Sequence, residues 1–254
     1  MNSALEAWKN PAILDAQFRP HYSDTMGFHH YPHALDTAVA AEARAAAALE
    51  HGIPVVIEAL PSAGRGHDAG KHLRPGLEHP FATSEEYAMD VTRKILETLG
   101  TPEEIQEAST GSIATTNPNV ACNTPTDICL RQGDLTAGGV ISPEPVIMLN
   151  GTYRLFTEEK QAKGEPVPVY YEEPEKLIRE FVEFGGRSRE ILMALTEGLT
   201  LGDHERDEEG RDFPEQAARN IALLKPETME RILGVSLKSI VEHRPVGVQL
   251  RLPG

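Results

Sequence analysis

A run of helix-forming residues, AVAAEARAAAALEH, stops at Gly52 and leads directly into a short apolar segment, IPVVIEAL. Alanine has the highest helix propensity, Asp36 and Thr37 are suitable capping residues, and glycine commonly follows the last residue of a helix. The segment 53–60 is rich in β-branched residues and apolar on both faces, which is typical of a buried strand in a parallel sheet. This order of elements predicts an α/β fold with a central, mostly parallel sheet that is flanked by helices.

Further strands of this sheet are expected where short apolar segments recur. The sequence offers such segments at 111–115, 145–151, 153–156 and 167–171. Thr83 or Ser84 should cap a helix over 84–100, because two acidic residues follow the cap and Gly100 ends the run. The strands and this helix together would complete the sheet and part of its cover.

From Pro174 onward the chain is helical in character. We expect helices at 174–184, 188–199, 214–224 and 226–243, followed by an edge strand within 244–253. Three of these helices open on a proline, a residue that is favoured in the first turn of a helix. The expected organisation is an α/β domain with His-rich loops over residues 1–150 and a helix-rich C-terminal region over 151–254 that packs on it.

The charge and hydropathy of the chain limit the classes of partner that it can bind. It has 24 basic and 39 acidic residues, a formal net charge of −15, which repels a phosphate backbone and argues against nucleic acid. No apolar stretch is long enough for a transmembrane helix, and the N-terminus lacks the pattern of a signal peptide. We expect a cytoplasmic protein with no membrane partner, which forms a homo-oligomer or serves as a subunit of a complex.

Histidines cluster in the first third of the chain, where eight of the ten precede residue 80. The segment FHHYPH brings His29, His30 and His33 within five positions. Neutral imidazole is a common ligand of transition metals, so these three residues are candidate ligands for one transition-metal ion. Pro32 argues against a continuous helix here, and a packed aromatic loop is the alternative interpretation.

The segment 61–81 is expected to be a glycine-rich loop that follows the strand predicted at 53–60. Long loops in this position are frequently functional in α/β folds. Its cationic and imidazole side chains sit in an acidic part of the chain, which favours recognition of a small anionic substrate; the candidates are Arg65, His67, His72 and Arg74. The alternative is local charge balance against Asp68 and Glu78.

Two cysteines, Cys122 and Cys129, are separated by six residues in a polar segment. This spacing fits neither a redox pair nor a zinc ribbon. A thiolate of lowered pKa can act as a nucleophile, so Cys122 is a candidate catalytic residue. The alternative is that both are structural thiols.

The segments ALEHGIPVVIEALPSAGR and LRPGLEHPFATSEEYAMDVTRKILETLG have a familiar order of elements. Over residues 34–105 the chain resembles the glycine, sarcosine and betaine reductase selenoprotein B superfamily and its small relatives with a selenocysteine-Gly-Ser-Cys motif. The resemblance implies an α/β fold and a pocket bounded by His33, the 65–74 loop and His79. The stretch that corresponds to the family's selenocysteine, 34–37, contains no cysteine, with His33 and Asp36 beside it.

The sequence and the resemblance together predict an enzyme that cleaves or reduces a carbon–heteroatom bond of a small anionic metabolite. His33 and His79 would be the acid–base or ligand residues, and Cys122 a further candidate nucleophile. One alternative is a metal-dependent lyase or hydrolase that uses His29, His30 and His33. Another is a non-catalytic subunit of a reductase complex.

Overall fold

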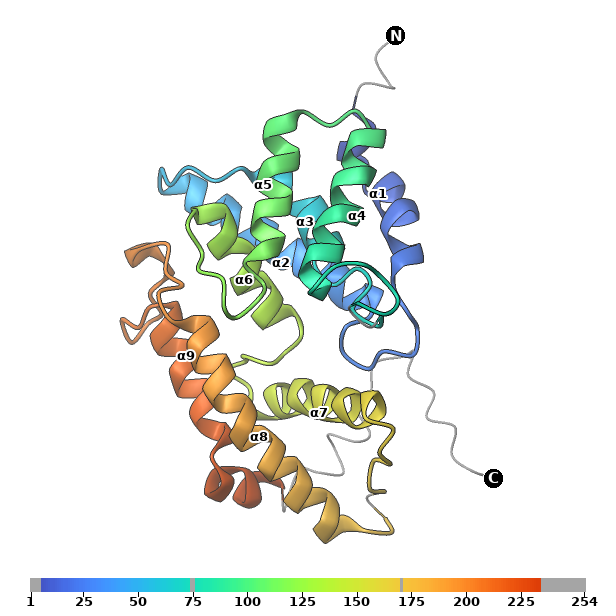
Figure 1. The fold of residues 1–254 in the computed structure, drawn as a ribbon. Helices are drawn as coiled ribbons and strands as arrows, with labels where there is room; N and C mark the ends of the chain where they lie inside the picture. Colours follow the sequence, from blue (N-terminus) through green and yellow to red (C-terminus); the bar gives the residue numbers. More distant parts are fainter. Residues whose placement is uncertain (1–5, 74–75, 170, 234–254) are drawn as a thin grey trace. The chain divides into compact units, whose positions relative to one another are not determined.

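The computed structural model describes residues 6–73, 76–169 and 171–233 (Figure 1). Within these residues the regular elements are all helices, and no strand is present. The α-helices are α1 (Pro11–Phe18), α2 (Tyr31–Glu50), α3 (Leu60–Gly66), α4 (Ser84–Thr98), α5 (Glu103–Ala114), α6 (Pro125–Ala137), α7 (Pro145–Ala162), α8 (Pro174–Thr196) and α9 (Phe213–Ile221). Short 3-10 helices lie at Ala7–Lys9, Arg19–His21, Ile57–Ala59, Asp203–Glu205 and Ala222–Leu224.

The predicted α/β fold with a parallel sheet is therefore wrong, and its leading strand shows why. Residues 53–56 form an irregular connection, after which a 3-10 turn leads into α3. The Ile53 N–H donates to the Ala48 carbonyl, and the Val56 N–H donates to the Thr126 hydroxyl. The backbone is thus satisfied by helices on either side, and the apolar side chains pack against a helical core without a neighbouring strand.

Among the described residues, the other segments predicted as strands are helical or irregular. Residues 111–115 fall in the last turn of α5 and its C-cap, and both 145–151 and 153–156 belong to α7. On α7 the buried residues recur at helical spacing, as Met148, Leu149, Thr152, Tyr153 and Phe156. Residues 167–169 are irregular, and the rest of the strand expected at 167–171 includes residue 170, which lies outside the described residues.

Several helix predictions are confirmed. Thr83 caps α4, with its hydroxyl accepting a hydrogen bond from the Glu86 N–H. The segments predicted at 174–184 and 188–199 are one continuous helix, α8, because Gly185 and Gly186 do not interrupt it. Residues 226–233 are helical; the remainder of the helix predicted to 243 and the edge strand at 244–253 lie outside the described residues.

The chain divides into two compact units. The first comprises the described residues among 1–23, 29–138 and 199–212, and contains α1 to α6. The second comprises those among 24–28, 139–198 and 213–254, and contains α7 to α9. Residue 150, where the sequence suggested a boundary, lies inside α7. Among the described residues, no helix has both the length and the apolar character that crossing a bilayer requires.

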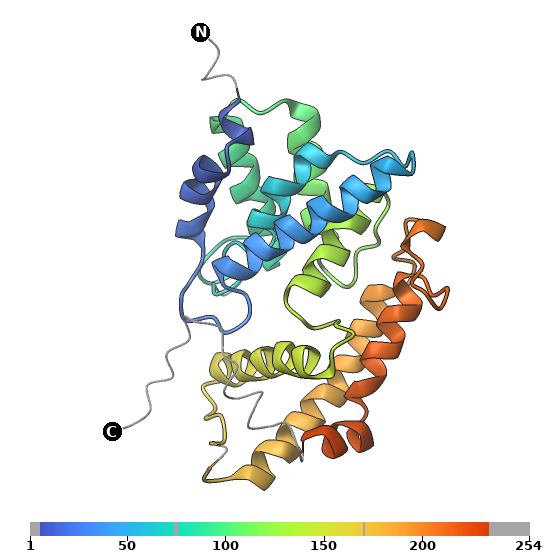
Figure 2. The ribbon, with the colours of Figure 1, turned by 180° about the vertical axis from the view of Figure 1, so that it is seen from behind.

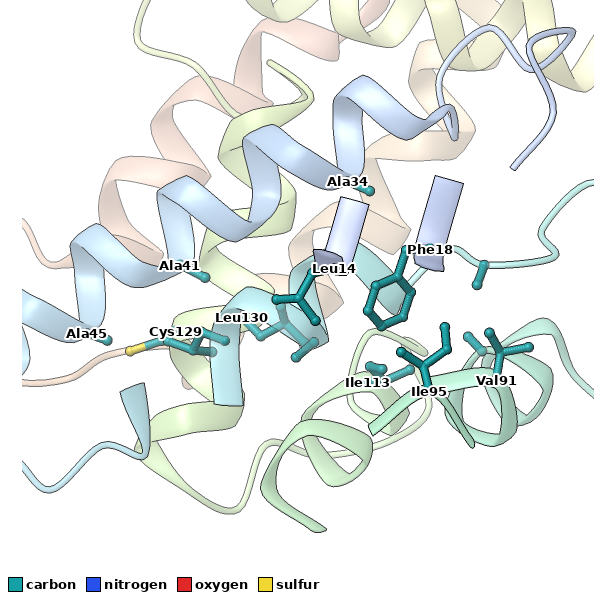
Figure 3. Close-up of a cluster of buried hydrophobic side chains, with 14 of the residues drawn as sticks. Leu14, Phe18, Ala34, Ala41, Ala45, Val91, Ile95, Ile113, Cys129 and Leu130 are labelled. Carbon is teal, nitrogen blue, oxygen red and sulfur yellow. The ribbon is translucent and has the colours of Figure 1, made fainter. Parts of the chain in front are cut away.

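Helix α2 packs along α3 and α6, and alanines line its buried face. Ala34, Ala41 and Ala45 point into the core cluster that Figure 3 shows, and Figure 2 shows α2 crossing the other helices of this unit. The larger side chains of the core come from α1, α4, α5 and α6, and include Leu14, Phe18, Val91, Ile95, Ile113, Cys129 and Leu130. The small residues let α3 and α6 approach the axis of α2 closely.

Two glycines allow the closest contacts between α2 and its neighbours. A Cβ on Gly64 of α3 would lie 2.4 Å from the Ala38 Cα, and a Cβ on Gly133 of α6 would lie 2.8 Å from the Ala41 backbone nitrogen. Both helices therefore touch α2 through backbone atoms. As a result, the first turn of α2, the end of α3 and the last part of α6 are held close together.

We predict that Gly64→Ala lowers the free energy of unfolding by about 1–3 kcal/mol, because the added methyl meets the backbone of α2. The matched control is Gly111→Ala in α5, where nothing lies within 4 Å of the new Cβ. That control should be stabilised by about 0.5–1 kcal/mol through helix propensity. Urea unfolding followed by circular dichroism measures both, and equal stability of the two variants would contradict the close-contact account.

Candidate metal centre

Three helices of the first unit each deliver ionisable side chains to one place. His33 lies in the first turn of α2, His67 and Asp68 directly follow α3, and Asp134 follows Gly133 near the end of α6. His33, His67 and Asp68 are buried, and Asp134 is half-buried. We call these four residues the His-Asp cluster.

The nitrogen and oxygen atoms of the cluster converge. His33 Nε2 lies 3.0 Å from Asp134 Oδ1, and His67 Nε2 lies 3.3 Å from the same oxygen. Asp68 Oδ2 lies 2.9 Å from His67 Nε2 and 3.6 Å from His33 Nε2. Ligand atoms of His33, His67 and Asp134 all lie within 4.8 Å of one another. Two imidazole nitrogens and one carboxylate oxygen therefore converge, and the Asp68 carboxylate lies against the two imidazoles.

Local backbone features orient the two imidazoles. His67 Nδ1 lies 2.7 Å from the Gly64 carbonyl oxygen, which can only accept, so Nδ1 carries the proton and Nε2 faces the carboxylates. His30 caps α2, its Nδ1 accepting from the His33 N–H, and Pro32 occupies the first turn, where its missing N–H costs no hydrogen bond. The FHHYPH segment is thus a helix start that fixes the position of His33.

The cluster contains buried polar atoms whose hydrogen-bonding capacity is not used. His67 Nε2 and Asp68 Oδ2 are 2.9 Å apart, yet neither makes a hydrogen bond of acceptable direction to another described residue. Buried polar atoms normally have partners, and unsatisfied ones mark a missing ion, water or function. Such atoms facing a common space fit a bound cation.

Charge interactions within the cluster are strong. Burial alone would lower the pKa of His67, but the carboxylates of Asp68 and Asp134 outweigh it and hold that pKa well above its usual value. Burial would raise the pKa values of Asp68 and Asp134, but neighbouring histidines, chiefly His67, hold both carboxyls well below their usual range. The carboxylates are therefore ionised, and a cation that binds here displaces the proton that His67 Nε2 shares with them.

The donor set suits a divalent transition metal. Imidazole favours ions such as zinc, iron, nickel and copper, whereas carboxylate also accepts manganese and magnesium. Two carboxylates also balance the charge of a divalent ion. His33 and Asp134 lie in helices, and His67 and Asp68 directly follow one, which supports the precise placement that a coordination site requires.

A lysine and a histidine stand beside the cluster. The attraction of Asp68, Glu85 and Asp134 outweighs the effect of burial and raises the pKa of Lys71, whose Nζ lies 3.0 Å from Glu85 Oε1. The ring of His29 lies 6.3 Å from that of His33, measured between centroids. These side chains add an ion pair between Lys71 and Glu85 and a further imidazole at the edge of the cluster.

The other residues expected to bind substrate, and His79, expected to be catalytic, lie in different settings. Arg65 is buried, and its Nε donates to Asp15 Oδ1 at 2.7 Å while another nitrogen donates to the Pro61 carbonyl, so it ties α3 to α1. His72 is exposed, and Arg74 lies outside the described residues. His79 is buried against Tyr87 and Phe81, at ring distances of 4.8 and 5.9 Å.

Neither cysteine contributes to the cluster. Cys122 is half-buried in the connection between α5 and α6, and burial raises the pKa of its thiol although Arg131 opposes the effect. Cys129 is buried in the core, where burial and the charge of Glu205 raise the pKa of its thiol to about 12. A raised pKa leaves little thiolate near neutral pH.

Sequence reasoning missed the two carboxylates. Asp68 was interpreted only as a partner for local charge, although it directly follows His67. Asp134 lies on a helical stripe with Asp127 and Arg131, at positions i, i+4 and i+7 on α6, where Asp127 and Arg131 are buried. Buried ionisable groups repeated at helical spacing are the signal that would have identified this face.

Comparisons of the chain with protein-family models, with curated proteins and with solved structures found no match. The resemblance to the selenoprotein B superfamily therefore stays a prediction.

Proposed function

We propose that this protein is a hydrolase that binds one divalent transition-metal ion at the His-Asp cluster and cleaves a phosphate ester in a small anionic substrate. One observation carries the proposal: ligand atoms of His33, His67 and Asp134 lie within 4.8 Å of one another, and Asp68 Oδ2 lies 2.9 Å from His67 Nε2. Of the ligands expected from sequence, this site uses His33, and it adds His67, Asp68 and Asp134.

The residues around the cluster support hydrolysis of an anion. A divalent ion at such a site lowers the pKa of bound water and polarises an ester oxygen. The Lys71 ammonium supplies a positive charge for an anionic substrate oxygen, as lysine does at many phosphate sites. His29, beside His33, is placed to give a proton to the leaving oxygen.

The properties of the two cysteine thiols fit a hydrolase better than they fit a reductase. Reduction through a cysteine needs a reactive thiolate, and burial raises the pKa of both Cys122 and Cys129. The stretch that corresponds to the selenocysteine of the resembled family lies on α2, where Ala34 and Thr37 are buried. The cytoplasmic location proposed from the sequence is compatible with free thiols.

The first prediction concerns metal content. Wild-type protein loaded with manganese or zinc and then dialysed should retain one ion per chain, measured by inductively coupled plasma mass spectrometry. His67→Gln and Asp134→Asn should each lose most of that ion, because each removes a converging donor. Metal near 100 times its dissociation constant should add about 2.7 kcal/mol to wild-type stability, and less to these variants.

Matched controls separate loss of a ligand from a general change of charge. His51→Gln and Asp203→Asn make the same substitutions at residues outside the cluster, and both should bind metal like wild type. Metal-free wild-type protein under all loading conditions would end the proposal.

The second prediction concerns catalysis. p-Nitrophenyl phosphate and bis(p-nitrophenyl) phosphate serve as probes for a phosphate monoester and a diester. Chelation should abolish release of p-nitrophenol, and added metal should restore it. Lys71→Met should keep the metal but lower kcat/KM by about tenfold, the loss expected for one charge-assisted hydrogen bond. Bound metal without metal-dependent release from either probe would show a binding site without the proposed activity.

The third prediction concerns thiol reactivity. In native protein near neutral pH, Cys129 should react with a disulfide reagent far more slowly than a free thiol, because burial keeps it protonated. Protein unfolded in urea is the control, and both of its cysteines should react rapidly with the reagent. Cys122→Ser should leave turnover unchanged. Loss of turnover in Cys122→Ser would instead support the nucleophile predicted from sequence.

A further inference from the structure

The second unit carries a groove that the proposed chemistry does not use. It runs along α8, has a volume of about 1180 Å³, and is closed on its other side by Pro226 and Glu230. Ile191, at one end of the groove, is 55% exposed. A groove of this size with exposed apolar residues points to an occupant.

Two adjacent rows of α8 side chains line the groove. The first row is charged and changes sign at every fourth residue, as Glu175, Arg179, Glu183 and Arg187. The second row is small or apolar in its middle, with Ile178, Val182 and Gly186. A Cβ on Gly186 would meet nothing within 4 Å.

The charges of the first row are not paired with one another. Residues four apart on a helix are neighbours, so Glu175, Arg179 and Glu183 lie within reach of each other. Nevertheless, among the described residues none of these three makes an ion pair. Arg187 contacts Glu159 Oε1 at 3.2 Å, and its side chain is still 61% exposed. The row therefore presents its charges outward.

This pattern is complementary to itself in one orientation. In a two-fold interface, residue i meets residue j and residue j meets residue i. If two copies of α8 lie antiparallel with the axis level with Phe181, Glu175 faces Arg187 of the second copy and Arg179 faces its Glu183. Every pair in the row is then of opposite charge. Parallel helices in the same register would instead place like charges together.

We propose that the groove is a homodimer interface, in which α8 of a second copy of this chain packs antiparallel in it. Ile178 lies near the two-fold axis and supplies apolar contact, Val182 is already buried in its own chain, and the charged row flanks Ile178. A homodimer is one form of the homo-oligomer expected from the sequence. The proposal does not depend on the proposed hydrolase activity.

The test uses charge exchange in the full-length protein. Sedimentation velocity over a roughly hundredfold range of concentration should show a wild-type dimer. Glu183→Arg and Arg179→Glu should each weaken the dimer at least about tenfold, because the symmetry repeats the like-charge contact twice. Glu104→Arg, an exposed site on α5, makes the same charge change as Glu183→Arg and should leave the dimer intact. Circular dichroism checks that each variant is folded.

Mixing the two single variants gives the decisive result. A chain with two acidic residues at 179 and 183 should pair with a chain that has two arginines there, so the equimolar mixture should form a heterodimer. The double variant should form a homodimer again. A wild-type monomer would overturn the proposal and assign the groove to another segment of the chain or to a different partner. A dimer that persists in both single variants would place the interface elsewhere and overturn it too.

Discussion

The contact of α2 with the backbones of α3 and α6 is the constraint on which the first unit depends. Gly64 against Ala38 and Gly133 against Ala41 leave no room for a side chain on either glycine. Helices that touch through backbone atoms have a restricted crossing position, because any shift opens a gap or creates a clash. The two glycines lie three residues before His67 and one residue before Asp134, so the packing that holds the core also sets the geometry of the His-Asp cluster.

Gathering four ionisable groups in this place has a cost. Moving charged groups out of water is unfavourable by several kcal/mol per ion unless partners compensate. In the cluster, the partners are the carboxylates and imidazoles themselves, with Lys71 and Glu85 at the edge. Ionisable groups gathered at a cost to stability are a feature of functional sites rather than of ordinary cores.

The same unit contains charged groups that have purely structural partners. Arg131, buried on the same stripe of α6 as Asp134, donates to the backbone carbonyls of Thr115, Asn117 and Val120. It therefore secures the connection between α5 and α6. Arg65 does the same between α3 and α1 through Asp15. What distinguishes the cluster from these is that its donor atoms face one another around a space instead of facing carbonyl groups.

The sequence by itself determined the local elements whose signals are short-range. The alanine-rich run predicted the body of α2, although the helix begins at Tyr31, before the cap expected at Asp36 or Thr37. Thr83 predicted the start of α4, and prolines marked the starts of α8 and the helical residues from 226. It also identified His33 and His67 as functional candidates from their neighbours in the chain. Capping, propensity and residue clustering act over a few positions and can be recognised without a structure.

Only the tertiary structure decided the fold class and the composition of the site. Short β-branched segments such as IPVV are equally compatible with a strand and with a connection buried between helices, and the presence or absence of a pairing strand settles the matter. Asp134 lies 101 residues from His33 in the chain and contacts it at 3.0 Å. No local pattern specifies that contact, because it results from the backbone approach of α6 to α2 at Gly133.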